Sequence, residues 1–185
     1  MKALFFLEYL KHMRMVGAVA PSSRFLAQQM MAPIDFARAK TIVELGPGTG
    51  SFSRVVVARR QAGTKLLLIE RNHAFYDELV QQFSGEPDIA IECGSAADLG
   101  VFLKKHHLPK RVDYVISGLP FAALPRSESN AILSEVTKHL HKDGAFVTFQ
   151  YTRLMLPLFD QHFKTVALRR EWRNIPPAYI VDCKL

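Results

Sequence analysis

Three glycines and a glutamate carry the chemistry that is easiest to read from the sequence. Residues 43–50 read Val-Glu-Leu-Gly-Pro-Gly-Thr-Gly, so Gly46, Gly48 and Gly50 follow an apolar, strand-like stretch and precede a helix-compatible one. Glycines let a ligand come close to the backbone, and a helix start offers N–H groups without an intrahelical partner. A second apolar run ends in Glu70, whose carboxylate can accept both hydroxyls of a ribose. This arrangement predicts a site for a nucleoside cofactor.

A second glutamate narrows the identity of the cofactor. Glu44 stands two residues ahead of the first glycine, where it could reach a cationic amine. A ribose-binding acid together with an acid near an ammonium group suits S-adenosylmethionine. The spacing resembles motif I of class I methyltransferases, Glu-x-Gly-x-Gly-x-Gly, and differs from the Gly-x-Gly-x-x-Gly of dinucleotide dehydrogenases. We therefore predict a methyltransferase, and we include Pro47 and Arg71 among its expected cofactor contacts.

The segment after the third predicted strand is expected to hold the adenine ring. Class I enzymes often carry an acid just after the glycine of this segment. Here Ser95 takes that place, and the acid comes later, at Asp98. The Ser95 hydroxyl can bond to adenine, and the backbone N–H of Ala96 can serve the ring. The sequence leaves open which of these contacts operates.

A fourth motif, Ser-Gly-Leu-Pro-Phe at residues 117–121, follows the fourth predicted strand, where the transferred methyl group is expected. It resembles the Asn-Leu-Pro-Tyr and Asp-Pro-Pro-Tyr motifs of amino-group methyltransferases, in which a polar side chain and a carbonyl next to proline align the nitrogen. The Asn or Asp is missing here, which disfavours a flat adenine and favours an amine oriented by backbone carbonyls. We expect Ser117, Leu119 and Phe121 to act in catalysis, with Ser117 also contacting the cofactor.

These motifs require a sheet whose strands end at a common edge. Short apolar runs alternate with helix-compatible patterns, which favours a parallel sheet with crossover helices. The predicted strands are 41–45, 65–70, 88–93, 112–117, 144–151, 165–172 and 178–184, and the predicted helices are 51–62, 73–84, 96–106, 126–141 and 155–162. No helix separates the last two strands, so they are predicted to form an antiparallel hairpin. The predicted fold class is α/β, a Rossmann-like class I methyltransferase domain over residues 41–185 with a seven-stranded, mostly parallel sheet.

Residues 1–40 precede the first predicted strand and form the other predicted region. On a helical wheel of residues 2–16, apolar side chains gather on one side and charged ones on the other, although two apolar residues interrupt the polar face. Another helix is expected to start near Ser22 or Ser23. The region is either an ordinary helix packed on the sheet or a lid whose outer face touches a membrane, and one helix can do both. Tyr9, Ser22 and Ser23 are its expected substrate contacts.

The composition restricts the partners and the compartment. The chain has 24 Lys and Arg against 17 Asp and Glu, a formal charge of +7, which suits an anionic partner such as nucleic acid or an acidic lipid surface. No stretch approaches the roughly 20 apolar residues of a transmembrane helix. The apolar start is interrupted by charges too early for a signal peptide, and two cysteines, Cys93 and Cys183, give no disulfide framework. We therefore expect a cytoplasmic protein that is soluble or lies on a membrane without crossing it.

Several motifs together resemble a narrower family, the small soluble bacterial phospholipid N-methyltransferases. The resemblance rests on a leading amphipathic helix, Gly-Ala-Val-x-Pro-Ser-Ser at 17–23, the glycine run, Ser-Gly-Leu-Pro, and Asn-x-Pro-Pro-Ala at 174–178. It implies methylation of the amine of phosphatidylethanolamine, stepwise towards phosphatidylcholine, with some relatives acting on ornithine lipids. The cofactor residues that it implies are Glu44, Gly46, Gly48 and Glu70. It also implies a peripheral protein on the inner face of the cytoplasmic membrane, with an anionic membrane surface and a phospholipid substrate as partners.

The expected chemistry follows from the state of the amine. A protonated lipid amine is not a nucleophile, so the site must remove a proton and align the lone pair with the sulfonium methyl group. Proximity and orientation would supply most of the rate. Aromatic rings can hold the methylated ammonium by cation–π contact, with Tyr9, Phe121 and Tyr179 as candidates, and we count Tyr179 among the catalytic residues. No residue stands out as the general base, and the histidines, which lie in or near predicted helices, predict no metal site.

Other functions compete with this interpretation. An rRNA adenine N6-dimethyltransferase would explain the charge and the Leu-Pro-Phe sequence. Those enzymes usually carry a helical RNA-binding domain after the sheet, whereas the last predicted strand here, 178–184, is followed by a single residue. We therefore expect no nucleic-acid partner. A methyltransferase for small-molecule amines and a silent module that binds cofactor or membrane are the further alternatives. The intact glycine run and Glu70 argue against a silent module. The head group, the number of methyl groups and the oligomeric state are open.

Overall fold

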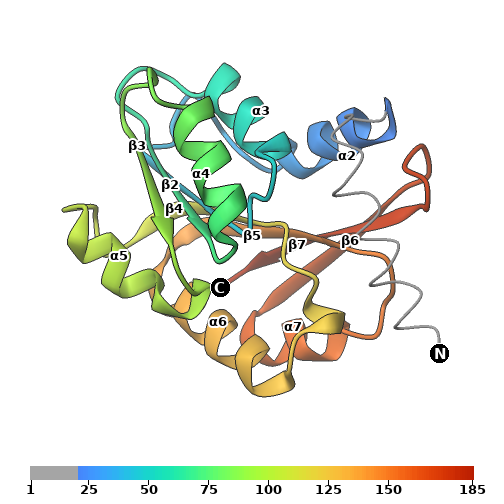
Figure 1. Cartoon of the computed structure of the whole chain (residues 1–185). Coiled ribbons are helices and arrows are strands. Elements are labelled where there is room, and N and C mark those ends of the chain that lie inside the picture. The colour runs from blue at the N-terminus through green and yellow to red at the C-terminus, as the bar shows by residue number, and fades with distance from the viewer. Residues whose placement is uncertain (1–20) are drawn as a thin grey trace.

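In the part of the chain that the computed structural model describes, residues 21–185, seven strands form one sheet (Figure 1). The strands are β1 (Thr41–Leu45), β2 (Lys65–Glu70), β3 (Ile89–Cys93), β4 (Val112–Ser117), β5 (Leu140–Gln150), β6 (Thr165–Glu171) and β7 (Ala178–Lys184). Across the sheet their order is β3-β2-β1-β4-β5-β7-β6. The amphipathic stretch 2–16, for which we predict either packing on the sheet or a lid that touches a membrane, lies outside the described residues.

The strand order reverses between β1 and β4, and this reversal determines where a ligand can bind. β1 pairs in parallel with β2 on one side and with β4 on the other. Connections that leave these neighbouring strands in opposite directions open a crevice at the carboxyl ends of the strands. β7 pairs antiparallel with both β5 and β6. The predicted sheet, mostly parallel with an antiparallel last strand, is therefore confirmed.

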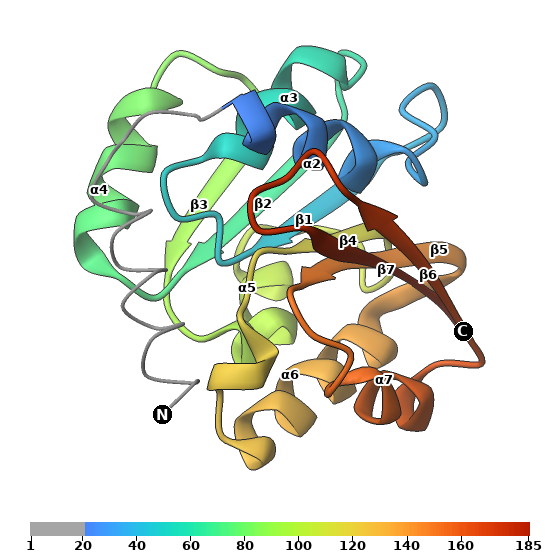
Figure 2. The ribbon, with the colours of Figure 1, turned by 90° about the vertical axis from the view of Figure 1, so that its right-hand side faces the viewer.

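Helices cover both faces of the sheet (Figure 2). They are α2 (Pro21–Met31), α3 (Ser51–Arg59), α4 (His73–Gln82), α5 (Leu99–Lys105), α6 (Arg126–His139) and α7 (Leu156–His162), with the short 3₁₀ turns η1 (Ala96–Asp98) and η2 (Phe121–Ala123). One hydrophobic core joins the sheet to α5, α6 and α7, and a second core joins it to α2, α3 and α4. Within residues 21–185, no helix is both long enough and apolar enough to cross a bilayer.

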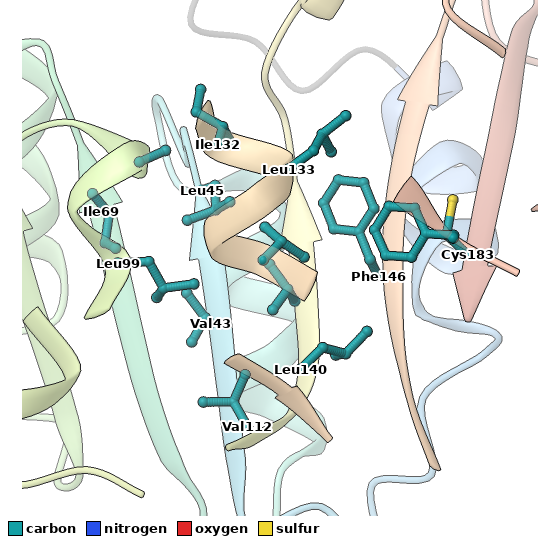
Figure 3. Close-up of a cluster of buried hydrophobic side chains, with 14 of the residues drawn as sticks. Val43, Leu45, Ile69, Leu99, Val112, Ile132, Leu133, Leu140, Phe146 and Cys183 are labelled. Atoms are coloured by element: carbon teal, nitrogen blue, oxygen red, sulfur yellow. The ribbon is translucent and has the colours of Figure 1, made fainter. Parts of the chain in front are cut away.

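The central strands are buried on both faces because their side chains alternate between the two cores. Val43 and Leu45 of β1 lie in the core with α5, α6 and α7, whereas Ile42 lies in the other core. Figure 3 shows the first of these cores, where Phe146 of β5 lies beside the helices. The Phe146 ring stacks on Phe163 with a centroid distance of 5.5 Å. Burial of each such side chain contributes about 1.5–3 kcal/mol, which holds the strand ends in fixed positions.

Several predicted bounds differ from the structure by one to three residues, and two further differences change how an element starts or is divided. β5 starts at Leu140 rather than at Gly144, because Leu140 pairs with Val112 ahead of an irregularity in the β4–β5 register. Gly144 lies inside this bend, where an added Cβ would come within 2.2 Å of the Asp113 carbonyl oxygen. The predicted helix 96–106 is divided into η1 and α5. Neither difference moves the carboxyl ends of the strands, where the site is predicted.

The described part of residues 1–40 packs into the core of the sheet. Met30 and Met31 of α2 are fully buried. Arg169 of β6 donates hydrogen bonds to the side-chain and backbone oxygens of Gln29 at 3.0 and 3.1 Å. α2 is therefore a helix packed on the sheet, and a lid or membrane role for the region stays a prediction.

Candidate active site

The turn between β1 and α3 holds all three glycines of the motif in a left-handed conformation. The φ angles are +67° at Gly46, +57° at Gly48 and +75° at Gly50, a region that residues with a Cβ rarely adopt. Gly50 is the N-cap of α3 and supplies no side-chain cap. The first N–H groups of α3 are therefore left for a ligand to bond.

The middle glycine of this turn faces open space. A Cβ at Gly46 would lie 2.6 Å from Cδ2 of Leu119, and one at Gly50 would lie 2.8 Å from Nε2 of Gln82. By contrast, no described residue comes within 4 Å of a Cβ added at Gly48. Gly48 is therefore the position where a ligand can approach the backbone of the turn most closely.

Glu70, at the end of β2, is bonded to the glycine turn itself. Its Oε2 accepts a hydrogen bond from the Gly48 N–H at 2.9 Å, and its Oε1 accepts one from the Asn72 N–H at 2.9 Å. The residue is 6% exposed, so both bonds are shielded from water. A carboxylate has about four acceptor positions, which leaves about two for ligand hydroxyls. The structure thus brings Glu70 and the turn together, as the predicted ribose contact requires.

Glu44, two residues before the turn, is fully buried, and only one of its two carboxylate oxygens has a hydrogen-bond partner among the described residues. Its Oε2 accepts a hydrogen bond from the Ser53 hydroxyl of α3 at 2.7 Å, whereas Oε1 has no partner among the described residues. Burial raises the pKa of Glu44 to about 7 against the opposing effect of the Ser53 hydrogen bond, and the nearby Glu70 carboxylate raises it further. An unpaired buried carboxylate oxygen is costly unless a donor or cation satisfies it. The environment of Glu44 therefore fits a cationic amine.

The loop after β4 packs directly against the glycine turn. The Gly118 N–H donates a hydrogen bond to the Leu45 carbonyl at 2.9 Å. A Cβ at Gly118 would lie 2.7 Å from the Gly46 carbonyl oxygen, so this approach of two backbone segments requires glycine. The Ser-Gly-Leu-Pro motif is thereby held beside the predicted cofactor turn.

Two polar residues of β5 fix this loop, although the sequence pattern did not single them out. The Thr148 hydroxyl donates to the Ser117 carbonyl at 3.1 Å, and the Gln150 amide donates to the Leu119 carbonyl at 3.3 Å. Both side chains are buried in the structure. The available sequence signal is weak, namely two polar residues, two positions apart, at the end of an apolar strand. These two bonds engage the carbonyls of Ser117 and Leu119 but not the carbonyl of Gly118, which lies between them in the sequence.

Ser117 and Leu119 serve this loop in different ways. Ser117 is fully buried, and its hydroxyl accepts a hydrogen bond from the Leu119 N–H at 3.2 Å. Both oxygens of Ser117 accept hydrogen bonds that shape the loop, which gives the residue a positioning role, and its predicted contacts with the reacting group and the cofactor stay predictions. The Leu119 side chain closes the turn at Gly46.

Ser95 and Ala96 lie next to the end of β2. Ser95 is the N-cap of η1, and its hydroxyl accepts a hydrogen bond from the Ala97 N–H at 3.2 Å. The neighbouring Gly94 N–H donates to the Glu70 carbonyl at 3.0 Å, which ties this turn to the end of β2. The Ser95 hydroxyl can still donate its proton to a ligand. Ala96 is buried. Both residues are thus near Glu70, and the predicted adenine contact stays a prediction.

Pro47 and Arg71 lie differently relative to the turn. Pro47 is part of it, and its carbonyl accepts a hydrogen bond from the Gly50 N–H at 3.0 Å. Arg71 instead reaches α6, where its guanidinium bonds to Glu128 at 3.0 Å, and its side chain is 75% exposed. The Arg71 guanidinium is therefore paired with an acid of α6, and its predicted cofactor contact stays a prediction.

Phe121 lies in the core rather than in the crevice. It is 0% exposed, and its ring packs edge-to-face on Phe146 and Phe159 with centroid distances of 6.2 and 5.4 Å. The reason is that the 3₁₀ turn η2 directs this side chain toward the core that contains α6 and α7. Its ring has no free face for an ammonium group, so the geometry does not support the predicted catalytic contact.

Tyr179, at the start of β7, reaches the expected edge of the sheet because it pairs with Gln150 of β5. The guanidinium carbons of Arg153 and Arg170 each lie 5.0 Å from the centre of its ring. Two cations beside one ring disfavour a third, so this environment attracts anions more readily than a methylated ammonium. The predicted cation–π role of Tyr179 is therefore not supported.

The remaining predicted contacts cannot be assigned to the crevice. The backbones of Ser22 and Ser23 belong to the first turn of α2, and Tyr9 lies outside the described residues. Their predicted contact with the substrate stays a prediction. Among residues 21–185, no group of three or more His, Cys, Asp or Glu side chains is arranged to hold a metal ion.

Comparison with known proteins adds one relative by sequence. No protein-family profile matches the chain. An ornithine lipid N-methyltransferase from Singulisphaera acidiphila is 28% identical over 186 residues, which cover 98% of this chain and 94% of that protein. The similarity therefore extends over nearly the whole of both chains.

Solved structures show which fold this is. The N-methyltransferase NodS from Bradyrhizobium japonicum, solved with S-adenosyl-L-homocysteine, matches with a TM-score of 0.70 at 10% identity, over 89% of this chain and 88% of that one. A TehB-like SAM-dependent methyltransferase from Corynebacterium glutamicum matches with a TM-score of 0.62 at 14% identity, over 100% of this chain and 98% of that one. The chain therefore has the class I methyltransferase fold.

Proposed function

We propose that this protein is an S-adenosylmethionine-dependent N-methyltransferase that acts on the amine of a membrane lipid. The observation that carries this proposal is the direct contact between the glycine turn and the β4 loop at Gly118, which brings the predicted cofactor turn beside a motif that resembles those of amino-group methyltransferases. The similarity to an ornithine lipid N-methyltransferase supports the lipid amine. The fold shared with NodS, solved with S-adenosyl-L-homocysteine, supports the cofactor.

The residues around the turn fit S-adenosylmethionine. The unpaired Oε1 of Glu44 suits the cofactor's ammonium group, and the open side of Gly48 suits close approach to the backbone. The remaining acceptor positions of Glu70 suit the ribose hydroxyls, with Ser95 and Ala96 available for adenine. When bound, S-adenosylmethionine supplies an electrophilic methyl group on its sulfonium.

The β4 loop orients the lipid amine. Thr148 and Gln150 fix the carbonyls on either side of Gly118, so the Gly118 carbonyl is held in one direction. We assign to this carbonyl an N–H of the substrate amine, because an N–H bonded there leaves the nitrogen lone pair free for attack. The amine must first lose its proton, since an ammonium has no lone pair. Positioning of this kind contributes a large part of the rate in reactions between two bound groups.

Two lipid head groups deserve the first tests. The sequence relative favours ornithine lipid, and the motif resemblance favours phosphatidylethanolamine and its methylated intermediates. Both lipids carry a primary amine close to an anionic group at the membrane surface. On either substrate the enzyme would work as a peripheral protein at the inner face of the cytoplasmic membrane.

A transfer assay tests the proposal. Purified protein receives methyl-labelled S-adenosylmethionine and vesicles that contain ornithine lipid, phosphatidylethanolamine or neither, after which the lipids are extracted and resolved. We expect label in one or both of the amine lipids and none in vesicles without them. An unlabelled lipid fraction, with cofactor binding intact by calorimetry, would contradict the lipid assignment. A parallel reaction with ribosomal RNA tests the adenine alternative.

A further inference from the structure

Exposed apolar side chains concentrate at one corner of the molecule. Among the side chains that the structure describes, three of the five exposed large hydrophobic ones lie on two neighbouring segments. These segments are the β5–α7 loop (residues 151–155), which carries Leu154, and the β6–β7 tip (residues 172–177), which carries Trp172 and Ile175. Leu154 is 79% exposed, Trp172 65% and Ile175 73%. Single exposed apolar residues are ordinary, but a cluster of this kind marks an interaction surface.

Both segments lie at the edge of the sheet that carries the candidate active site. The β5–α7 loop leaves the carboxyl end of β5, directly after Gln150. β7 runs antiparallel to β5, and its second residue, Tyr179, pairs with Gln150, so the β6–β7 tip projects at the same edge. In Figures 1 and 2 the tip is the red loop beside α2. A surface that contacts these two segments would therefore face the crevice as well.

Arginine and aromatic side chains connect the two segments. The Arg170 guanidinium lies 3.7 Å from the centre of the Trp172 ring and 5.0 Å from that of Tyr179. On the other segment, the Arg153 guanidinium also lies 5.0 Å from the Tyr179 ring centre. Such stacking keeps long arginine side chains in place while their charge stays available. The corner thus combines exposed apolar groups with ordered cations.

The β6–β7 tip is held in a defined position against α2. Arg173 bonds through its side chain to Glu171 at 2.8 and 2.9 Å, and its guanidinium lies 4.2 Å from the centre of the Phe25 ring. The Asn174 amide donates to the Pro176 carbonyl at 2.8 Å, inside the tip. Little conformational freedom is therefore left for the tip to lose on binding, which favours affinity.

We propose that the β6–β7 tip and the β5–α7 loop dock the protein on an anionic lipid bilayer, with Leu154, Trp172 and Ile175 inserted into the interface. This inference deepens the proposed function and rests on it, because the same docking brings the crevice to the head groups. The charge of the corner matches that partner: Arg153, Arg170 and Arg173 stand against one acid, Glu171, which is 5% exposed and paired. Tryptophan and arginine are also the side chains best suited to the boundary between head groups and acyl chains.

The chain contains one tryptophan, and it lies in the tip, so its fluorescence reports on this contact directly. Full-length protein is mixed with vesicles of phosphatidylcholine containing phosphatidylglycerol, without amine lipid and without cofactor. We expect Trp172 emission to shift to shorter wavelength and to be quenched by lipids brominated on their acyl chains. Vesicles of phosphatidylcholine alone, or high salt, should weaken both effects. Sedimentation with the vesicles without any change in Trp172 emission would overturn the proposal.

Variants separate the apolar contribution from the charge. L154S/I175S keeps the tryptophan and should lose about tenfold or more in vesicle affinity. R153Q/R170Q should lose about fivefold for each arginine, because each contributes to attraction by an anionic surface. The matched control is Val101→Ser on α5, a side chain that is 64% exposed outside this corner, and it should bind as the wild type does. Equal affinity of all variants, with unchanged melting curves, would overturn the proposal.

Activity distinguishes the failure of docking from the failure of the proposed function. L154S/I175S should methylate a short-chain amine lipid dispersed in detergent at the wild-type rate but lose activity on vesicles. A Trp172 shift in a protein that methylates no lipid would support docking and contradict the methyltransferase assignment. Methylation of vesicle lipids by a protein whose Trp172 emission never changes would support the assignment and overturn the docking surface.

Discussion

The two halves of the candidate site are built in different ways. The cofactor half joins the glycine turn to the end of β2 and consists of left-handed glycines, backbone N–H groups and two buried carboxylates. The amine half joins the β4 loop to β5 and consists of backbone carbonyls held by neutral side chains, and the partners of each bond are 31 positions apart in the sequence. The cofactor half depends on properties that few amino acids have, namely a backbone that adopts positive φ angles and a carboxylate side chain. The amine half depends on backbone carbonyls, which every residue has, so its function depends on where the fold places them.

Gly118 belongs to both halves, and we expect its substitution to have the largest effect. Gly118→Ala would place a Cβ 2.7 Å from the Gly46 carbonyl oxygen and force two backbone segments apart. We expect a loss of about 1–3 kcal/mol in the free energy of unfolding, measured by denaturant titration, and loss of most methyl transfer. Gly85→Ala is the matched control, since no described residue lies within 4 Å of its added Cβ. Normal activity in Gly118→Ala would show that the halves need no close contact.

Removal of Glu70 should damage the cofactor half alone. Glu70→Ala strands the N–H groups of Gly48 and Asn72, which the carboxylate now satisfies, and removes the acceptors for the ribose. We expect the dissociation constant for S-adenosylmethionine to rise about 10–100-fold, measured by calorimetry. Glu78→Ala, on an exposed position of α4, should leave it unchanged. Unaltered cofactor affinity in Glu70→Ala would remove the ribose assignment.

Glu44 should make the cofactor half sensitive to pH. Its pKa is raised by burial from 4.5 to about 7, so between these values the folded protein holds a proton that the unfolded chain has released. Stability of the ligand-free protein should therefore fall as the pH rises through this window. A cofactor ammonium favours the ionised carboxylate, so cofactor affinity should rise with pH up to about 7, by at most about tenfold per unit.

The control for this pH dependence is Glu44→Gln, which keeps the shape of the side chain and removes its titration. Melting curves and calorimetry between about pH 5 and pH 8 should show both slopes in the wild type and neither in the variant. Equal slopes in the two proteins would assign the titration to another group.

Gln150 should give the smallest effect and confine it to the amine half. Gln150→Ala removes the hydrogen bond to the Leu119 carbonyl and loosens the β4 loop. We expect kcat/KM for the lipid to fall about 3–10-fold, while the dissociation constant for the cofactor stays unchanged. Gln161→Ala, exposed on α7, is the matched control. A change in cofactor affinity instead would mean that the two halves are not separable.

Most of the sheet could be predicted from the sequence because its strands are short, buried on both faces and flanked by turns. The predicted bounds of β1, β2, β4 and β7 agree with the structure. The start of β5 could not be predicted in this way. Leu140 is followed by His-Lys-Asp-Gly, a polar stretch without strand character, and it joins the sheet through a pairing with Val112 that no local pattern encodes.

The site likewise has a part that local sequence patterns predict and a part that depends on contacts between distant residues. The glycine run and Glu70 follow from residue types at a spacing that few folds share. Thr148 and Gln150 act through bonds to distant carbonyls, and the burial of Phe121 depends on the direction of one 3₁₀ turn. The exposure of the corner that carries Trp172 likewise follows from packing and not from composition.

The central claim is that the methyl group is transferred to a lipid amine, and a pair of substrates tests it most directly. Methyl-labelled S-adenosylmethionine is supplied with vesicles that carry ornithine lipid or phosphatidylethanolamine, each either with its free amine or with the amine acetylated. We predict label in at least one of the free-amine lipids and none in its acetylated form. Equal labelling of the free and acetylated forms, or labelling of neither lipid, would contradict the assignment.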